Sequence, residues 1–187
     1  MTSFISRLCL ALFIFPFFAF HARGVDYNSS LSGGWYHTLF TKTDGSLWGM
    51  GRNNKGQLGD GTTTDRTIPV KIEDKDIIAV ACGTYHSLFI KNDGSLWGMG
   101  LNNYGQLGDG TTTDQLNPVQ IVPSGVIAVV ADYHTMFLKS DGTLWGTGRN
   151  NYGQLGNGNT TNQSSPVQVL TGVSTIAAGF NHSLAVK

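Results

Sequence analysis

Short apolar runs alternate with polar, glycine-rich turns along this chain, and one such unit is typical of four antiparallel strands. Residues 86–91 (HSLFIK) form an apolar run that favours a β-strand, and residues 96–100 (LWGMG) form the return strand. The Asp-Gly between them, in residues 92–95, predicts a tight hairpin because glycine accepts the positive φ of the turn. A third strand begins at Pro118, where proline removes no ladder bond. Residues 127–130 supply the fourth strand.

This unit repeats along nearly the whole chain. Its histidine and its tryptophan recur at His37, His86, His134 and His182 and at Trp48, Trp97 and Trp145. Four antiparallel strands in a period of roughly 50 residues are typical of one blade of a β-propeller. No stretch carries a helical period of useful length. We therefore predict an all-β fold, a partial β-propeller of about three four-stranded blades with almost no helix.

The number of blades is low for a closed ring. Counting strands from His37 gives three full blades and one extra strand, residues 183–186. Propellers close with about four to eight blades, so this arc leaves open sheet edges. Three alternatives follow: self-association through the open blade edges, closure by a partner chain, or an incomplete fragment of a longer propeller. In the third unit the turn before His134 lacks the glycine found at Gly83, which predicts a distorted turn there.

The N-terminus differs from the repeats. Arg7 precedes an almost unbroken apolar run over residues 8–20, and small residues follow at 22–24. This is the order of a secretory signal peptide. The run of about 13 residues is shorter than the ~20 that a membrane-spanning helix needs. We predict that 1–24 is a signal peptide, that 25–187 is the repeat domain, and that the protein is secreted or lies in the cell envelope; a retained membrane anchor is the alternative.

Composition and charge narrow the functional classes. Charged residues make up 13% of the chain, and glycine accounts for 25 of its 187 residues. Residues 1–24 hold Arg7 and Arg23 and no acidic residue, so 10 basic and 12 acidic residues remain in the repeat domain, a net charge of −2. This balance argues against nucleic acid as a partner. Cys82 is the one cysteine outside residues 1–24, and we interpret it as a small buried side chain.

The repeated pattern resembles that of the regulator of chromosome condensation family. It reads His-Ser-Leu, Asp-Gly-Ser-Leu-Trp-Gly, Gly-Gln-Leu-Gly-Asp-Gly-Thr and Pro-Val, and it extends over residues 31–187. The resemblance implies a β-propeller, usually of seven blades in that family. Members that exchange nucleotides on a nuclear GTPase act inside the cell, which the predicted signal peptide argues against. Secreted bacterial members include an enzyme inhibitor that covers its target with one face of the propeller.

Several residues that could bind a metal or act in catalysis recur with the repeat, so we attribute them to the fold before any site. One histidine per blade at the start of the same strand is explained by a hydrogen bond to the backbone, and a shared metal site is the alternative. The loops at 60–65 and 109–114 carry paired aspartates that could bind Ca²⁺, but the copy at 157–162 has asparagines, so we interpret them as turns. No nucleophile–base pair, phosphate loop or carboxylate dyad stands out. We predict a protein without catalysis and without a cofactor.

In a repeat protein, binding residues usually occupy the positions that the repeat fold does not constrain. The near-identical units differ at the two positions before each histidine, which we expect on equivalent turns of one face of the propeller. They also differ at the single position before the first loop glycine. The candidate binding residues are Trp35, Tyr36, Thr84, Tyr85, Asp132, Tyr133, Phe180, Asn181, Tyr104 and Tyr152. Exposed aromatic side chains favour a recognition surface for a protein. A carbohydrate-binding module or adhesin is the alternative, and neutral variation at surface sites also explains the differences.

Overall fold

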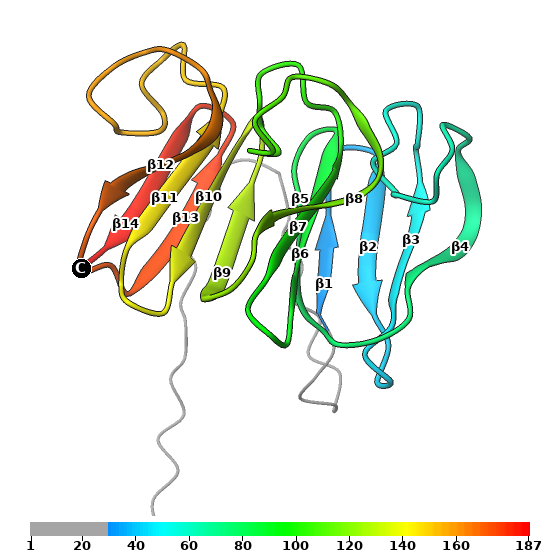
Figure 1. The fold of residues 1–187 in the computed structure, drawn as a ribbon. Helices are drawn as coiled ribbons and strands as arrows, with labels where there is room; N and C mark the ends of the chain where they lie inside the picture. The colour runs from blue at the N-terminus through cyan, green and yellow to red at the C-terminus, as the bar shows by residue number, and fades with distance from the viewer. Residues whose placement is uncertain (1–29) are drawn as a thin grey trace, which may run out of the picture.

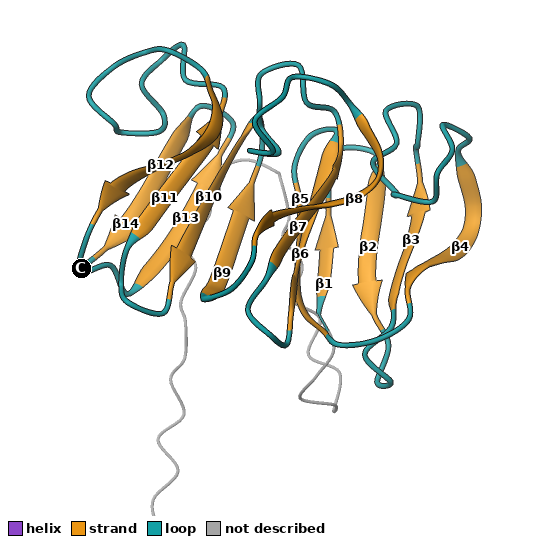
Figure 2. Ribbon diagram, viewed as in Figure 1, coloured by secondary structure: helices purple, strands orange, loops and turns teal. Residues whose placement is uncertain are grey.

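The computed structural model describes residues 30–187, and every regular element in this range is a β-strand (Figures 1 and 2). Three four-stranded antiparallel sheets and one two-stranded sheet follow one another along the chain. The predicted all-β fold of about three four-stranded blades is confirmed. Nothing between residues 30 and 187 forms a helix that could cross a membrane. The predicted signal peptide, 1–24, lies outside the described residues.

The strands of each sheet are consecutive in sequence and in space. The first sheet contains β1 (Leu31–Gly33), β2 (His37–Thr41), β3 (Leu47–Gly51) and β4 (Arg66–Glu73). The second contains β5 (Ile77–Cys82), β6 (His86–Lys91), β7 (Leu96–Gly100) and β8 (Gln115–Val122). The third contains β9 (Val126–Ala131), β10 (His134–Lys139), β11 (Leu144–Gly148) and β12 (Gln163–Leu170). The last contains β13 (Thr175–Gly179) and β14 (His182–Val186).

Each blade begins one strand earlier than the sequence predicts: the first strand of a sheet is the strand before the histidine strand, and not the histidine strand itself. Residues 127–130 were expected to end a blade, but β9 pairs with β10 of the following sheet, with Val129 opposite Phe137. The reason is the tight turn that joins each such strand to the histidine strand after it, which makes the two a hairpin. The first sheet likewise begins with β1. The remainder is therefore a two-stranded half-blade, β13–β14, and not the single strand 183–186.

The hydrophobic core lies between successive blades. Leu39 and Leu58 of the first blade pack in one cluster with Phe89 and Met99 of the second, and all four are fully buried. The second and third blades form an equivalent cluster, which includes Phe137. Burial of each large apolar side chain contributes about 1.5–3 kcal/mol. The blades are thus held together by their stacked faces.

A buried hydrogen-bond relay also joins each blade to the next. His37 Nε2 lies 2.8 Å from Ser87 Oγ of the second blade, and this hydroxyl donates to the backbone oxygen of Gln57 at 2.7 Å. The same histidine–hydroxyl pair recurs as His86–Thr135 at 3.1 Å and His134–Ser183 at 2.7 Å. Since the hydroxyl proton goes to the carbonyl, the oxygen accepts from a protonated Nε2. We call each such relay an inter-blade clip.

The clips make these histidines structural and electrically neutral. Burial lowers the pKa of His37 and of His134 to about 4 and that of His86 to about 3. The structural interpretation of the histidines agrees with this arrangement. The expected backbone partner was wrong, because Nε2 bonds to a side-chain hydroxyl of the next blade, which in turn reaches the backbone.

Candidate functional site

Aromatic side chains from all four sheets meet around Trp35. Its ring centroid lies 5.9 Å from that of Tyr85, 6.4 Å from that of Tyr133 and 6.2 Å from that of Phe180. Tyr36 is a fourth neighbour at 6.1 Å. Tyr104 joins the group through Tyr133, with 6.4 Å between their centroids. We call this group the aromatic platform: Trp35, Tyr36, Tyr85, Tyr104, Tyr133 and Phe180.

The turns between the inner strand and the histidine strand bring these rings together. Backbone bonds from Gly34 N to His37 O and from Gly83 N to His86 O, both 2.9 Å, close the first two turns around two residues each. Neighbouring turns touch directly, because a Cβ atom on Gly34 would lie 2.5 Å from the backbone oxygen of Gly83. Glycine therefore lets the turns approach one another, and the side chains between them converge.

The third turn is irregular, as the missing glycine predicts. Asp132 N bonds to His134 O at 3.0 Å, so this turn holds one residue, Tyr133, where the others hold two. Asp132 consequently takes the place of the glycine. Its backbone oxygen accepts Thr84 N at 3.0 Å, and its carboxylate accepts the Thr84 hydroxyl at 2.7 Å. Burial raises the pKa of this carboxyl.

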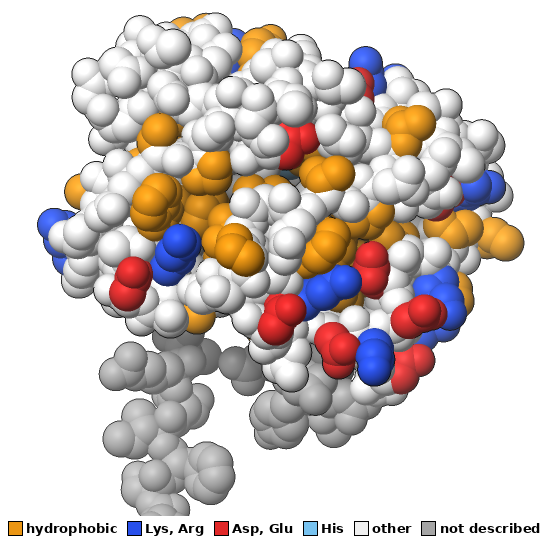
Figure 3. Space-filling model, in the orientation of Figure 1, with side chains coloured by type: hydrophobic (Ala, Val, Ile, Leu, Met, Phe, Trp, Pro, Cys, Tyr) orange, Lys and Arg blue, Asp and Glu red, His pale blue; other side chains and the backbone are white. Residues whose placement is uncertain are grey.

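The expectation that all ten candidate residues emerge on the surface therefore does not hold. Thr84 is only 2% exposed and braces the second and third turns through Asp132. Tyr36 and Tyr152 are the most accessible, with 57% and 68% of their surface exposed. Phe180 is also exposed, whereas Trp35, Tyr85, Tyr104, Tyr133, Asp132 and Asn181 are half-buried. Figure 3 shows further hydrophobic side chains across the middle of the molecule, with many of the charged ones below them.

Two arginines complete the platform. The guanidinium carbon of Arg52 lies 5.3 Å from the ring centroid of Tyr36 and 5.5 Å from that of Tyr85. The guanidinium carbon of Arg149 lies 5.4–5.5 Å from the centroids of Tyr104, Tyr133 and Tyr152. Such cation–π contacts hold a positive charge against aromatic faces. Tyr152, which belongs to no ring pair of the platform, is thus attached to it by Arg149.

The sequence analysis missed both arginines, although a signal was present. They follow the last glycine of the return strand, where the three units read Arg52, Leu101 and Arg149. A backbone bond places each at the platform: Arg52 N donates to Tyr36 O at 2.8 Å and Arg149 N to Tyr133 O at 3.3 Å. Variation at this position is of the same kind as the variation that identified the aromatic residues.

The aspartates considered for calcium serve their own loops. Asp60 accepts Asn53 Nδ2 at 2.9 Å and the Thr62 hydroxyl at 2.7 Å on one oxygen, and Arg66 Nε at 2.7 Å on the other. In the third loop the amide oxygen of Asn157 takes the same role. An uncharged amide suffices there, which supports the interpretation of these loops as turns.

Cys82 lies in the core between the first two blades, with its sulfur 3.3 Å from Ser32 O. Burial raises the pKa of the thiol to about 11, so the thiolate is scarce at neutral pH. The residue fits the interpretation as a small buried side chain.

Stacked four-stranded blades with one set of turns gathered into a platform define this protein as a partial β-propeller. Three segments match the family described as Regulator of chromosome condensation (RCC1) repeat: residues 44–90, 93–138 and 141–186. The chain belongs to this family. The matched segments start within the hairpin turns between β2 and β3, β6 and β7, and β10 and β11, so the sequence repeat and the structural blade are out of phase.

Known relatives are considerably longer than this chain. Ultraviolet-B receptor UVR8 of Arabidopsis thaliana is 40% identical over 60 residues, which cover 30% of this chain and 14% of that protein. Protein RCC2 homolog of Danio rerio is 48% identical over 50 residues, 25% of this chain and 10% of that protein. The structure of human WBSCR16 matches with a TM-score of 0.73 and 25% identity over 83% of this chain and 44% of that chain. The structure of Prp20p of Saccharomyces cerevisiae matches with a TM-score of 0.72 and 23% identity over 83% of this chain and 42% of that chain.

Proposed function

We propose that this chain is a secreted or envelope-associated scaffold that binds a protein partner, without catalysis of its own. The observation that carries the proposal is the convergence of aromatic side chains from four sheets with Arg52 and Arg149 between them. Tyrosine, tryptophan and arginine are the residues that dominate binding energy at protein interfaces. Prp20p, a relative in fold, is described with binding properties to Gsp1p and histones, which supports a protein as the partner.

The way the rings pack favours a protein over a carbohydrate. Sugars stack on open aromatic faces, but Trp35 is stacked against Phe180 at an interplanar angle of 21°. The Arg52 guanidinium lies over the ring of Tyr36. What the platform offers is a broad, partly apolar surface with two positive charges, and such a surface complements a protein that presents carboxylates beside apolar side chains.

Export rests on the N-terminal sequence. Residues 1–24 have the order of a signal peptide, and their removal leaves the repeat domain with net charge −2. The intact mass of the protein recovered from the periplasm or culture medium of a producing bacterium tests this part. A mass that corresponds to a chain starting at Val25 is expected. A full-length chain retained in the cytosolic fraction would contradict export and leave the binding proposal standing.

Binding through the platform is tested with matched variants of the immobilised full chain. Extracellular and envelope proteins that the wild type retains are quantified by mass spectrometry against Tyr36→Ala, Arg52→Ala and a control, Ile68→Ala. Ile68 lies on β4 and is 71% exposed. We expect one partner to be retained by the wild type and the control and to bind each platform variant at least about tenfold less tightly.

Two results would overturn this assignment. A partner that binds the platform variants as well as it binds the wild type would show that another surface is used. Saturable binding to an oligosaccharide on a glycan array, lost in Tyr36→Ala and kept in Ile68→Ala, would assign the platform to carbohydrate recognition.

A further inference from the structure

The third loop differs from its two counterparts at one chemically important position. The loops that join β3 to β4 and β7 to β8 carry Asp-Gly at 60–61 and 109–110, whereas the loop that joins β11 to β12 carries Asn-Gly at 157–158. The backbone conformation is the same in both forms, with φ 83° at Gly110 and 84° at Gly158. The third loop therefore has the shape of an aspartate loop, with an amide in place of the carboxylate.

In the second loop, both oxygens of the carboxylate are held. Asp109 Oδ1 accepts Asn102 Nδ2 at 3.0 Å, and Asp109 Oδ2 accepts Gln115 Nε2 at 2.8 Å. Burial raises the pKa of this carboxyl, but hydrogen bonds from Thr111, Asn102 and Gln115 outweigh burial and hold the pKa below its ordinary value. The loop thus stabilises a negative charge at this position.

The third loop keeps the corresponding donors around an amide. Asn157 Oδ1 accepts Asn150 Nδ2 at 3.0 Å. The other terminal atom of Asn157 is a nitrogen, which cannot accept a hydrogen bond. Gln163 occupies the place of the glutamine in the second loop, and its Nε2 donates to Thr161 O at 3.1 Å. The loop therefore contains a donor for a second carboxylate oxygen and lacks that oxygen.

The same position carries the one Asn-Gly pair in the chain, Asn157 and Gly158. Asn-Gly is the dipeptide in which deamidation is easiest, because glycine has no side chain to hinder attack of its backbone nitrogen on the asparagine side chain. Gly158 is exposed, and so are Gly61 and Gly110 in the loops against which a following blade packs. The glycine of this loop is therefore open to solvent in every copy of the unit.

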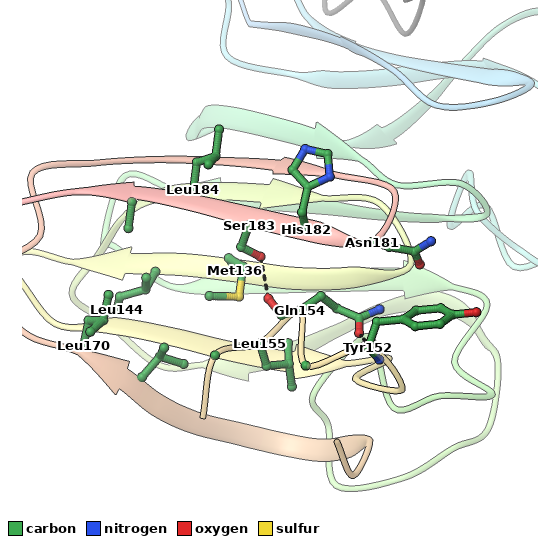
Figure 4. Close-up of a pocket in the computed structure, with 14 residues that line it drawn as sticks. Met136, Leu144, Tyr152, Gln154, Leu155, Leu170, Asn181, His182, Ser183 and Leu184 are labelled. Atoms are coloured by element: carbon green, nitrogen blue, oxygen red, sulfur yellow. Dashed lines mark hydrogen bonds between the residues drawn. The ribbon is translucent and has the colours of Figure 1, made fainter. Parts of the chain in front are cut away.

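A fixed hydrogen-bond donor faces the carbonyl that would be attacked. Asn150, which donates to Asn157 Oδ1, is fully buried, and its own Oδ1 accepts Leu155 N at 2.9 Å. Gln154, the residue before Leu155, is held by β14, because the Ser183 hydroxyl donates to Gln154 O at 2.8 Å (Figure 4). A preorganised donor of this kind stabilises the negative charge that develops on a carbonyl oxygen under attack.

We infer that Asn157 is a site of spontaneous deamidation, and that the product is an aspartate with the role of Asp60 and Asp109. Gly158 N attacks Cγ of Asn157, the bond from Cγ to Nδ2 breaks, and ammonia leaves with the proton of Gly158 N. The result is a succinimide ring. Water then adds to Cγ, the bond from Cγ to Gly158 N breaks, and this nitrogen regains a proton. The reaction consumes one water, releases one ammonia and adds one carboxylate to the loop.

The contacts of the loop favour aspartate over isoaspartate. Asn150 Nδ2 polarises the carbonyl at Cγ, where addition of water gives aspartate. Addition of water at the backbone carbonyl would give isoaspartate, which inserts a carbon atom into the main chain. Aspartate leaves the backbone unchanged, strengthens the bond from Asn150 by its charge and gives Gln163 Nε2 a carboxylate acceptor. The modified loop is therefore expected to be at least as stable as the original.

The reaction is measured on the full chain, kept folded in neutral and in mildly alkaline buffer. Samples taken over time are digested with trypsin, and electron-transfer dissociation of the peptide 150–187 distinguishes aspartate from isoaspartate at each position. We expect conversion at Asn157 to be faster at the higher pH, because the attacking nitrogen must lose its proton. The exposed asparagines of the same loop are the internal controls: Asn151, Asn159 and Asn162. They should react at least about tenfold more slowly, because the residue after each of them has a side chain.

Two variants test the product. Asn157→Asp should unfold at a denaturant midpoint equal to or above that of the wild type, because the new carboxylate receives the bonds that Asp109 receives. The matched control, Asn150→Asp, makes the same change from amide to carboxylate in the same loop. It removes the donor to three oxygen atoms of the loop and should lower the midpoint.

Conversion at Asn157 that is no faster than at the other asparagines would overturn the inference, and so would isoaspartate as the main product. A midpoint of Asn157→Asp below that of the wild type would show that the loop is built for the amide, which also contradicts it. None of these measurements uses a binding partner, so their outcome is independent of the proposed function.

Discussion

At the scale of single residues, one hydroxyl per interface links two blades chemically. Ser87 Oγ accepts from His37 Nε2 and donates to Gln57 O, and only a hydroxyl side chain does both at that place. The position after each histidine reads Thr38, Ser87, Thr135 and Ser183. This regularity was visible in the sequence, but the sequence does not show that the hydroxyl reaches back to the preceding blade. For that reason the histidine was assigned a backbone partner.

Removal of this hydroxyl is expected to destabilise the fold. Ser87→Ala leaves a buried imidazole N–H and a buried carbonyl without partners, which costs about 1–3 kcal/mol of unfolding free energy. Ser183→Ala breaks the part-buried clip beside the half-blade and should cost less. Ser87→Thr should keep most of the stability, because Thr135 fills the equivalent place. Denaturant unfolding at pH 7 measures all three. An Ala variant within experimental error of the wild type would contradict the role of the clip.

At the scale of elements, the glycines of the return strand allow close contact that a side chain would prevent. Gly100→Ala is expected to cost about 1–3 kcal/mol beyond the usual penalty of a positive φ, because the new Cβ meets the backbone of Tyr85 and His86. Gly153→Ala is the matched control, with φ 74° and no described atom within 4 Å of its Cβ position. It should cost only the ~1–2 kcal/mol of the left-handed conformation. Thermal unfolding of both variants checks this, and equal losses would count against steric contact as the cause.

The existence and type of the strands could be predicted, but the start of each blade could not. A periodic sequence has no marked beginning, and residues 127–130 are joined by short connections to the strands on both sides. The length of the connections therefore does not decide which neighbouring strand pairs with these residues. The register does, with Met136 opposite Val130 and Thr135 opposite Ala131. The distorted third turn was predictable because a missing glycine has a direct backbone consequence.

At the scale of the whole molecule, the platform depends on how the blades are arranged around one another. The sequence placed equivalent turns on one face, but contact between Trp35 and Phe180, from the first and last sheets, requires the curvature that stacked blades produce. Arg52 and Arg149 each also contact a tyrosine of the neighbouring blade, Tyr85 and Tyr104 respectively, and these two contacts depend on the same curvature. The candidate residues could thus be predicted from the sequence of each repeat, but their convergence into one platform could not.

The three buried histidines also make the stability of the whole molecule depend on pH. In the unfolded chain, histidine takes up a proton near pH ~6.5. In the folded chain, burial lowers the pKa of His37 and His134 to about 4 and of His86 to about 3. Between these limits the unfolded state binds more protons than the folded state. The free energy of unfolding therefore has its full value above pH ~6.5 and decreases as the pH drops toward 4.

Each histidine contributes a slope of up to about 1.4 kcal/mol per pH unit in this window. Burial raises the pKa of Asp132 in the folded state, which offsets part of the loss. Exposed aspartates with lowered pKa, such as Asp44 and Asp93, titrate below the window. Urea unfolding at pH 7, 6 and 5 should give midpoints that decrease at each step. A midpoint independent of pH would mean that the clips open before the chain unfolds.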